Sequence, residues 1–414
     1  MNVKIAHTLN PGIIRVPASK SLAQRFILAS ALASEKTTLL NTGNSEDVLH
    51  MLDIAQKLGA VVHAIENGVE ITPGVNPVSN LFNAGESGLG VRLLLPVLAA
   101  KQGKYTIKGK GSLNKRPMDA IIRFLEQNGV TVHADDGFLP ITLEGKLRGG
   151  KLEIDGSKSS QYISGLLMAL PFCETDSELT VTNLSSKPYV DLTMDVLNQF
   201  GIAVDHRSYQ QFFVRGNQSY IPKTGSFTIE GDYSGTANWM VAGAIGNHAV
   251  TMHGLKKNSL QGDAKMLDAL NDSGAKIQWN EHSITVSKSE NNSFEFNATD
   301  CPDLFPPLVI LAAAAKGTSV ITGASRLIDK ESNRAQVLQT EFGKLGLKIK
   351  LDNDVMQIEG TGTLLSGTIH SNNDHRIAMA GAIAALLTND SVTIEQAEAV
   401  AKSYPEFWIH CGIN

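Results

Sequence analysis

The sequence VLHMLDIAQKLGAVVH occupies residues 48–63, and its pattern recurs along the chain. Its apolar residues follow helical spacing up to Leu58, Gly59 comes next, and a short apolar run follows. This order predicts a helix, a glycine at its C-terminal cap and a strand. The same order ends at five glycines that are 70, 72, 73 and 72 residues apart: Gly59, Gly129, Gly201, Gly274 and Gly346.

A second kind of helix, rich in Ala and Leu, is predicted ahead of each of these elements. Each copy leads into a short strand, and the six copies cover residues 22–32, 91–100, 162–170, 237–245, 308–315 and 377–387. The repeating unit is therefore helix, strand, loop, helix and strands. At about 72 residues it is longer than the common solenoid repeats and resembles a βαβαββ module.

The sixth copy stops before its closing glycine and strands. Strand-like sequence occurs at residues 3–6 and 13–16. We expect residues 1–14 to complete this copy. Three modules per domain then predict an N-terminal domain over residues 15–229, containing repeats 1–3. The C-terminal domain takes residues 1–14 plus 230–414, containing repeats 4–6.

Composition narrows the class of protein. Of the 414 residues, 42% are hydrophobic and 19% charged, a balance typical of globular chains. The net charge of −5 argues against a partner such as nucleic acid or an anionic membrane. Three distant cysteines without CxxC spacing exclude a disulfide framework and a thiolate zinc site, and they fit a reducing compartment. The start lacks a signal-peptide pattern and the longest apolar run, at 308–315, is too short to span a bilayer, so we expect a cytoplasmic location. We also expect a monomer.

Polar clusters recur at two places in the repeat. One set precedes the Ala/Leu-rich helices, at residues 19–21, 85–90, 157–161, 232–236, 301–303 and 373–376. The other follows the short strands, at 44–47, 114–117, 186–189, 261–263, 330–334 and 402–403. In or near these clusters lie Lys20, Arg25, Arg92, Arg116, Lys330, Arg334, Arg376 and Lys402. Cations beside helix N-termini predict a pocket for a multiply anionic small molecule.

The order of these motifs resembles one enzyme family. PASKSLAQR at residues 17–25 is similar to the P-G-S-K-S-x-x-x-R opening of the EPSP synthase (3-phosphoshikimate 1-carboxyvinyltransferase) family. Further motifs follow in the family's order, at residues 116–119, 159–161, 186–189, 302–303, 330–334, 374–376 and 401–402. The resemblance covers essentially the whole chain.

The resemblance implies an α/β fold, a two-domain inside-out α/β barrel in which each domain holds three βαβαββ repeats. It places the active site in the interdomain cleft. The implied reaction transfers the carboxyvinyl group of phosphoenolpyruvate to the 5-hydroxyl of shikimate 3-phosphate, through a tetrahedral intermediate, and releases phosphate. This is a step toward chorismate and the aromatic amino acids. Neither a cofactor nor a metal is implied.

The resemblance also assigns roles to residues. Shikimate 3-phosphate is expected at Lys20, Ser21, Arg25, Ser159, Ser160, Gln161, Ser186, Tyr189, Asp303 and Lys330. Phosphoenolpyruvate is expected at Lys20, Gly88, Arg92, Arg116, Gln161, Arg334, Arg376 and Lys402. The acid and base candidates are Lys20, Asp303, Lys330 and Glu331. We expect Asp303 to act as base toward the hydroxyl, and either Glu331 or Lys20 as acid toward the vinyl methylene.

One loop departs from the family pattern G-N-A-G-T-A-x-R. This chain has GESGLGVR at residues 85–92, so Glu86 replaces Asn and Leu89 replaces Thr, whereas Gly88 and Arg92 match. Glu86 puts a negative charge near the expected place of phosphoenolpyruvate. Asn333 stands where Asp is usual.

Two alternative assignments are open. UDP-N-acetylglucosamine 1-carboxyvinyltransferase shares this fold and chemistry, but it normally has Lys-Asn in place of Lys20-Ser21 and a cysteine in a first-domain loop. Here no cysteine precedes Cys173. A non-catalytic ring or clamp around nucleic acid is disfavoured by the net charge and by the lack of a basic stripe with interleaved aromatics.

Overall fold

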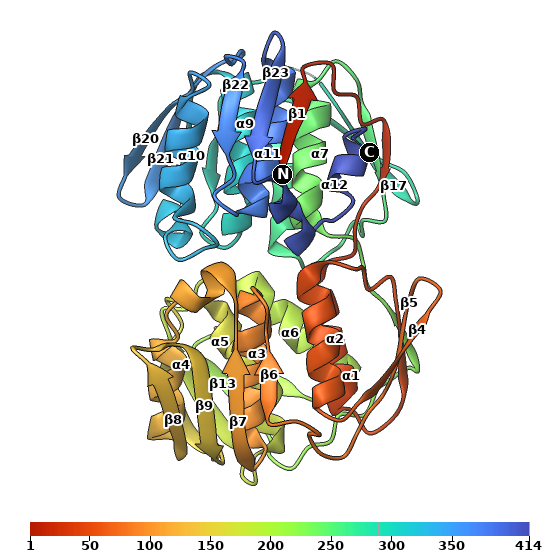
Figure 1. Ribbon diagram of the computed structural model, residues 1–414, viewed down its shortest axis with the longest axis vertical. Helices are drawn as coiled ribbons and strands as arrows, with labels where there is room; N and C mark the ends of the chain where they lie inside the picture. Colours follow the sequence, from red (N-terminus) through yellow and green to blue (C-terminus); the bar gives the residue numbers. More distant parts are fainter. Residues whose placement is uncertain (289, 414) are drawn as a thin grey trace. The chain divides into compact units, whose positions relative to one another are not determined.

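The computed structural model of the chain describes residues 1–288 and 290–413 and divides into two units (Figure 1). Unit 2 is one continuous stretch, residues 18–229, whereas unit 1 combines residues 1–17 with the chain from residue 230 onward. The sequence-based boundaries were 14/15 and 229/230; the structure divides the chain at 17/18 and 229/230. None of the described helices is both long and apolar enough to cross a membrane.

Unit 2 contains three modules of the predicted type. The middle one runs β6 (Leu81–Asn83), α3 (Gly88–Ala100), β7 (Gly103–Lys108), α4 (Asp119–Gln127), β8 (Val130–Asp135) and β9 (Phe138–Gly145). Its sheet has the order β6-β7-β9-β8, in which β6 and β7 are parallel and the other pairs antiparallel. The module is therefore βαβαββ, as the repeat predicts.

The other two modules of unit 2 follow the same plan. The third runs β10 (Gly150–Asp155), α5 (Ser160–Ala169), β11 (Ser177–Thr182), α6 (Lys187–Gln199), β12 (Val204–Arg207) and β13 (Gln211–Val214). The first has α1 (Lys20–Leu32), β3 (Thr37–Leu40), α2 (Glu46–Lys57), β4 (Val61–Ile65) and β5 (Gly68–Thr72). Its leading strand, β14 (Ser226–Thr228), comes from the far end of the unit and pairs in parallel with β3.

Unit 1 holds the remaining modules. The fourth runs α7 (Tyr233–Ile245), β15 (Val250–His253), α8 (Met266–Asp272), β16 (Lys276–Trp279) and β17 (Ser283–Ser287). The fifth runs β18 (Glu295–Asn297), α9 (Phe305–Ala314), β19 (Lys316–Thr322), α10 (Arg334–Gly343), β20 (Lys348–Asp352) and β21 (Val355–Thr361). The sixth has β22 (Gly367–His370), α11 (His375–Ala384) and β23 (Ser391–Glu395), before a short final helix α12 (Phe407–His410).

The N-terminal strands separate between two modules. As expected, β1 (Asn2–Ala6) completes the sixth module by pairing antiparallel with β23. The expectation that residues 13–16 join the same sheet is wrong, because β2 (Ile13–Arg15) pairs in parallel with β15 of the fourth module. The physical reason is that each module needs a strand ahead of its first helix. Residues 230–232 lead directly into α7 without forming a strand, so β2 supplies the leading strand of the fourth module.

The repeated glycines are confirmed as helix caps. All five have a positive φ, between 75° and 102°, just after the ends of α2, α4, α6, α8 and α10. A side chain is unfavourable in this left-handed conformation, which explains why glycine recurs at the same point of each module.

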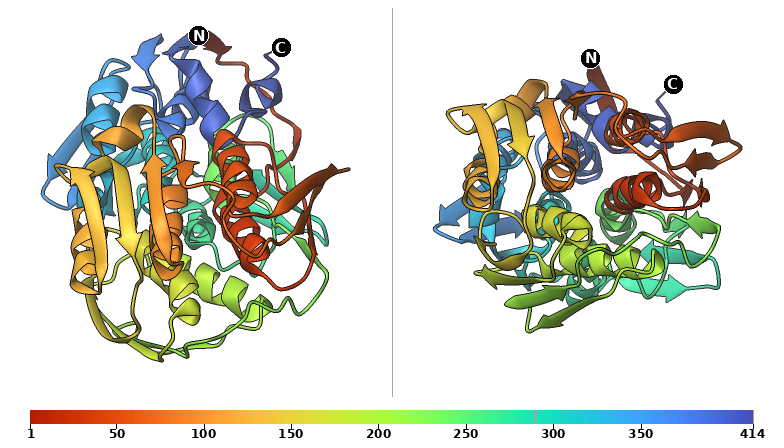
Figure 2. Two further views of the ribbon diagram at one scale, coloured as in Figure 1. Left: turned by 60° about the horizontal axis from the view of Figure 1, so that its bottom comes forward. Right: turned by 90° about the horizontal axis from the view of Figure 1, so that it is seen from below.

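The Ala/Leu-rich helices form the interior. Every residue of α3, α7, α9 and α11 is buried, whereas α2 and α4 bury one side only. In unit 2 the buried helices, such as α3 and α5, lie inside and the strands lie on the outside (Figure 2). This arrangement confirms the predicted inside-out α/β class.

Close helix contact in unit 2 requires a glycine at residue 165. A Cβ added there would overlap the carbonyl oxygen of Arg92 on α3 and lie 3.1 Å from Pro96 Cγ. We therefore predict that Gly165→Ala lowers the free energy of unfolding by about 2 kcal/mol, as overpacked cores do. Urea unfolding followed by circular dichroism measures the change.

Gly343→Ala is the matched control, because Gly343 also lies in a helix but has no atom within 4 Å of the added Cβ. This variant should be neutral or stabilising by about 0.5 kcal/mol, since alanine favours helix more than glycine does. Equal destabilisation by both variants would contradict the packing argument.

Candidate active site

In unit 2 the N-terminal parts of α1, α3 and α5 are joined by side-chain hydrogen bonds. Ser87, the N-cap of α3, donates from its hydroxyl to Gln24 Oε1 of α1 at 2.8 Å. Arg92 of α3 donates to Gln161 Oε1 of α5 at 2.9 Å. Three helix N-termini therefore lie together, and their backbone N–H groups and positive dipole ends favour an anion.

Two guanidinium groups lie over the start of α3. A Cβ at Gly88 would lie 2.8 Å from Nη1 of Arg116 and 3.0 Å from Nη1 of Arg92. Both arginines are buried, and Arg92 also lies 5.3 Å from the centre of the Tyr162 ring. Glycine at this position leaves room for both cations, which suits capture of a phosphate or carboxylate.

The Arg25 side chain is buried inside unit 2, which its sequence motif alone does not indicate. Its side chain is fully buried, and it donates to Thr193 Oγ1 at 2.8 Å, to the Ser21 carbonyl at 2.8 Å and to the Tyr189 carbonyl at 3.1 Å. A longer bond, at 3.3 Å, reaches Ser164. Burial lowers the pKa of Arg25 to about 10, so the guanidinium remains charged at neutral pH.

Thr193 and Ser164 were missed by the sequence analysis. Thr193 Oγ1 donates to Ser164 Oγ at 2.8 Å, and both hydroxyls thereby hold the Arg25 guanidinium. They carry no motif of their own. Their one sequence signal is helical spacing, because each lies four residues after a predicted contact, Ser160 or Tyr189.

The serines and the lysine occupy helix starts. Ser159 is the N-cap of α5, and its hydroxyl accepts from the Gln161 N–H at 3.2 Å. Ser186 precedes α6 with φ at 56°, a left-handed conformation that costs energy for a residue with a side chain. Lys20, the first residue of α1, forms an ion pair with Asp47 Oδ2 at 2.9 Å.

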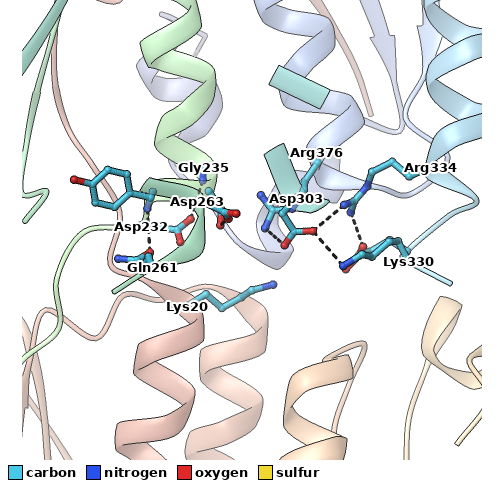
Figure 3. Close-up of polar contacts among 12 residues, drawn as sticks. Lys20, Asp232, Gly235, Gln261, Asp263, Asp303, Lys330, Arg334 and Arg376 are labelled. Carbon is cyan, nitrogen blue, oxygen red and sulfur yellow. Dashed lines mark hydrogen bonds and ion pairs between the residues drawn. The ribbon is translucent and has the colours of Figure 1, made fainter. Parts of the chain in front are cut away.

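Asp303 in unit 1 is surrounded by cations (Figure 3). Its carboxylate oxygens lie 2.8 Å from Arg334, 2.8 Å from Arg376 and 3.5 Å from Lys330. Burial alone would raise the pKa of Asp303, but the charges of Arg376, Lys330 and Arg334 outweigh it and hold the pKa well below its usual range. Asp303 is therefore an ionised hydrogen-bond acceptor.

Arg334 links this carboxylate to two others. Its side chain is fully buried, and it contacts Asp374 at 2.9 Å and Glu331 at 2.7 Å. Burial lowers the pKa of nearby Lys330, and the Asp303 charge offsets only part of that effect. Lys402 donates to the Asn373 carbonyl at 2.7 Å, next to Asp374.

Asp263 is a further carboxylate that received no role from the sequence. It is 1% exposed and accepts a short hydrogen bond from the Ser234 hydroxyl. Burial, and secondarily the charge of Asp303, raises the pKa of Asp263 to about 6. Its sequence signal was the polar cluster at 261–263, which has no recognisable motif.

The structure thus gathers the predicted residues into two sets. The set in unit 2 comprises Lys20, Ser21, Arg25, Gly88, Arg92, Arg116, Ser159, Ser160, Gln161, Ser186 and Tyr189. The set in unit 1 comprises Asp303, Lys330, Glu331, Arg334, Arg376 and Lys402. The first presents helix N-termini and cations, and the second pairs carboxylates with cations.

Comparisons with known proteins relate almost the whole chain to one enzyme family. Residues 5–410 match the family model described as EPSP synthase (3-phosphoshikimate 1-carboxyvinyltransferase). The 3-phosphoshikimate 1-carboxyvinyltransferase of Clostridium acetobutylicum is 38% identical, with 98% of this chain and 95% of that protein covered. That of Clostridium kluyveri is 36% identical at the same coverage. The solved EPSP synthase of Acinetobacter baumannii superposes with a TM-score of 0.82 at 27% identity, covering 99% of this chain and 97% of that one.

The raised pKa of Asp263 makes stability depend on pH. Between the pKa of an unfolded aspartate, about 3.9, and about 6, the folded state binds more protons, so stability falls as pH rises through this window. Asp263→Asn removes that penalty. We predict that the stability of this variant relative to the parent increases by about 1 kcal/mol from pH 5 to pH 8, measured by urea unfolding.

Asp272→Asn is the matched control, since Asp272 is an exposed aspartate of the same unit. It should keep the pH dependence of the parent. Parallel stability curves for Asp263→Asn and the parent would show that Asp263 does not titrate in this window.

Proposed function

The chain belongs to the EPSP synthase family, and on that premise we propose how its two sets of residues perform the family's reaction. The enzyme transfers the carboxyvinyl group of phosphoenolpyruvate to the 5-hydroxyl of shikimate 3-phosphate and releases phosphate, a step in aromatic amino acid biosynthesis. The alternative acceptor, UDP-N-acetylglucosamine, is not favoured by these relatives.

Shikimate 3-phosphate is proposed to bind the first turns of α1, α5 and α6. The hydroxyls of Ser159, Ser160 and Ser186 stand at helix starts, where a phosphate gains from backbone N–H groups as well. Arg25 supplies a cation that donates to the neutral oxygens of Thr193, Ser21 and Tyr189, and these partners do not cancel its charge. Ser21, Gln161 and Tyr189 are further proposed contacts in unit 2, and Asp303 and Lys330 are the proposed contacts in unit 1.

Phosphoenolpyruvate is proposed to bind the guanidinium groups over Gly88. Arg92 and Arg116 provide two buried cations at the N-terminus of α3, which supports capture of its phosphate or carboxylate. Gln161 is tied to this pair through Arg92. Lys20, Arg334, Arg376 and Lys402 supply the remaining cations.

Asp303 is the proposed base toward the 5-hydroxyl. In the substrate-free chain its cationic neighbours make it a weak base. An anionic substrate that pairs with Arg334 and Arg376 would offset their charge, so the proton affinity of Asp303 would rise when the substrate arrives. The carboxylate then accepts the hydroxyl proton as the oxygen attacks C2 of phosphoenolpyruvate.

Glu331 is the proposed acid toward the vinyl methylene. It contacts the same guanidinium as Asp303, that of Arg334, at 2.7 Å, so both groups belong to one charge cluster. Protonation of C3 gives a methyl group and the tetrahedral intermediate. Elimination then breaks the C2–O bond to phosphate and returns a methyl proton to the protein, which restores the double bond. Lys20, paired with Asp47, is assigned to charge stabilisation, and Lys330 to holding Asp303.

The observation that carries this proposal is the Asp303 carboxylate held between Arg334 and Arg376. The reaction is tested by phosphate release from phosphoenolpyruvate with each acceptor. Release should require shikimate 3-phosphate and should not occur with UDP-N-acetylglucosamine. The reverse preference would overturn the assignment.

The enzyme is further proposed to act as a monomer in the cytoplasm. Cys173, Cys301 and Cys411 are free thiols, which supports a reducing compartment. Light scattering after size exclusion tests the first point. Cell fractionation tests the second.

We predict that Asp303→Ala lowers kcat by about 10³-fold, as expected for loss of a general base. The variant should fold, because Arg334 keeps Asp374 and Glu331 as partners. It should still bind phosphoenolpyruvate when shikimate 3-phosphate is present, which isothermal titration calorimetry measures. Asp352→Ala, at an exposed position of the same unit, is the control. Near-normal turnover of Asp303→Ala would exclude the base role.

A further inference from the structure

Glu86 is the residue at which this chain departs most in charge from the family pattern. It directly precedes Ser87, the N-cap of α3, and so stands beside a helix start that should bind an anion. A carboxylate free to face that site would repel the substrate. Its actual contacts therefore decide what it does.

The Glu86 carboxylate is bonded to the next loop of the chain. Its Oε2 accepts from the Ser112 hydroxyl at 3.1 Å and from the Ser112 N–H at 3.3 Å. The same carboxylate lies directly against the Cα of Gly111, where an added Cβ would overlap it, and the φ of Gly111 is 56°, a left-handed conformation that favours glycine. The backbones are joined as well, because the Lys110 N–H donates to the Gly85 carbonyl at 2.8 Å.

The loop at residues 110–116 positions Arg116 at the N-terminus of α3, the proposed anion site. Gly111–Lys115 form a short 3-10 helix, and the Arg116 N–H closes it by donating to the Leu113 carbonyl at 3.1 Å. From that end, the Arg116 guanidinium reaches Gly88, where its Nη1 lies 2.8 Å from the Cβ position. Glu86 thus holds the start of the short helix whose end carries Arg116.

We propose that Glu86 is a positioning residue for phosphoenolpyruvate: by holding Ser112 it sets the place of Arg116 over the start of α3. The proposal rests on the proposed role of Arg116 in binding that substrate. Glu86 acts through the loop and does not touch the substrate. The charge that replaces the family's asparagine is used within the protein.

Two substitutions separate positioning from simple repulsion. Glu86→Gln removes the charge but keeps an acceptor for Ser112, so KM for phosphoenolpyruvate should stay within about threefold of the parent. Glu86→Ala removes the acceptor, and this KM should rise about tenfold. The KM for shikimate 3-phosphate, the kcat and the melting temperature should change little in both. If Glu86 only repelled the substrate, both variants would lower KM for phosphoenolpyruvate.

A double-mutant cycle tests the contact itself. Ser112→Ala should raise KM for phosphoenolpyruvate less than Glu86→Ala, since the Ser112 N–H remains, and the double variant should match Glu86→Ala alone. Additive effects would show that the two residues act separately and would overturn the proposal. Glu66→Ala, at an exposed position of the same unit, controls for loss of a negative charge.

Arg116→Ala keeps the two proposals distinguishable. A large rise in KM for phosphoenolpyruvate supports the substrate role of Arg116. Unchanged KM in Arg116→Ala would overturn that role. A rise in Arg116→Ala with no rise in Glu86→Ala would overturn the positioning role alone. Glu86→Ala could instead change the KM values for phosphoenolpyruvate and shikimate 3-phosphate equally, or lower the melting temperature. Either result would show that Glu86 has only a structural role and would overturn the positioning role.

Discussion

The buried guanidinium of Arg334 is the constraint on which the chemistry of unit 1 depends. A charge removed from water must be paired, and Arg334 meets this need with Asp303, Glu331 and Asp374. These carboxylates come from three separate segments of the chain, so one cation fixes the starts of α10 and α11 relative to Asp303. The proposed base and acid share this cation and are therefore held in one geometry.

Unit 2 also buries a guanidinium group, that of Arg25, but stabilises it with neutral oxygen atoms. Arg25 is equally buried, but its contacts are hydroxyls and carbonyls, which satisfy its N–H groups without cancelling its charge. The result is a positive environment beside helix N-termini in unit 2 and a nearly balanced one in unit 1. The first suits the binding of anionic substrates, and the second suits proton transfer.

Much of this organisation was predictable from sequence, because it follows from local rules. Gly59 and its four counterparts cap the second helix of five modules at its C-terminus. The Ala/Leu-rich composition of the other helices predicts that they are buried. The pairing of β2 with β15 was not predictable, since a three-residue strand carries no signal for a partner more than 230 positions away. Thr193, Ser164 and Asp263 were missed for a similar reason, because their roles arise only when separate helices meet. The contact of Glu86 with Ser112 likewise reverses what its charge alone suggests.

The pairing of β1 and β2 with strands far along the chain has a consequence for folding during biosynthesis. When β1 and β2 leave the ribosome, their partners at residues 391–395 and 250–253 do not yet exist. Unit 2, in contrast, contains all of its strands within one continuous stretch that ends with β14. The nascent chain can therefore complete unit 2 first. β2 finds its partner soon afterwards, when residues 250–253 have been added, whereas β1 keeps an unpaired edge until residues 391–395 have been added.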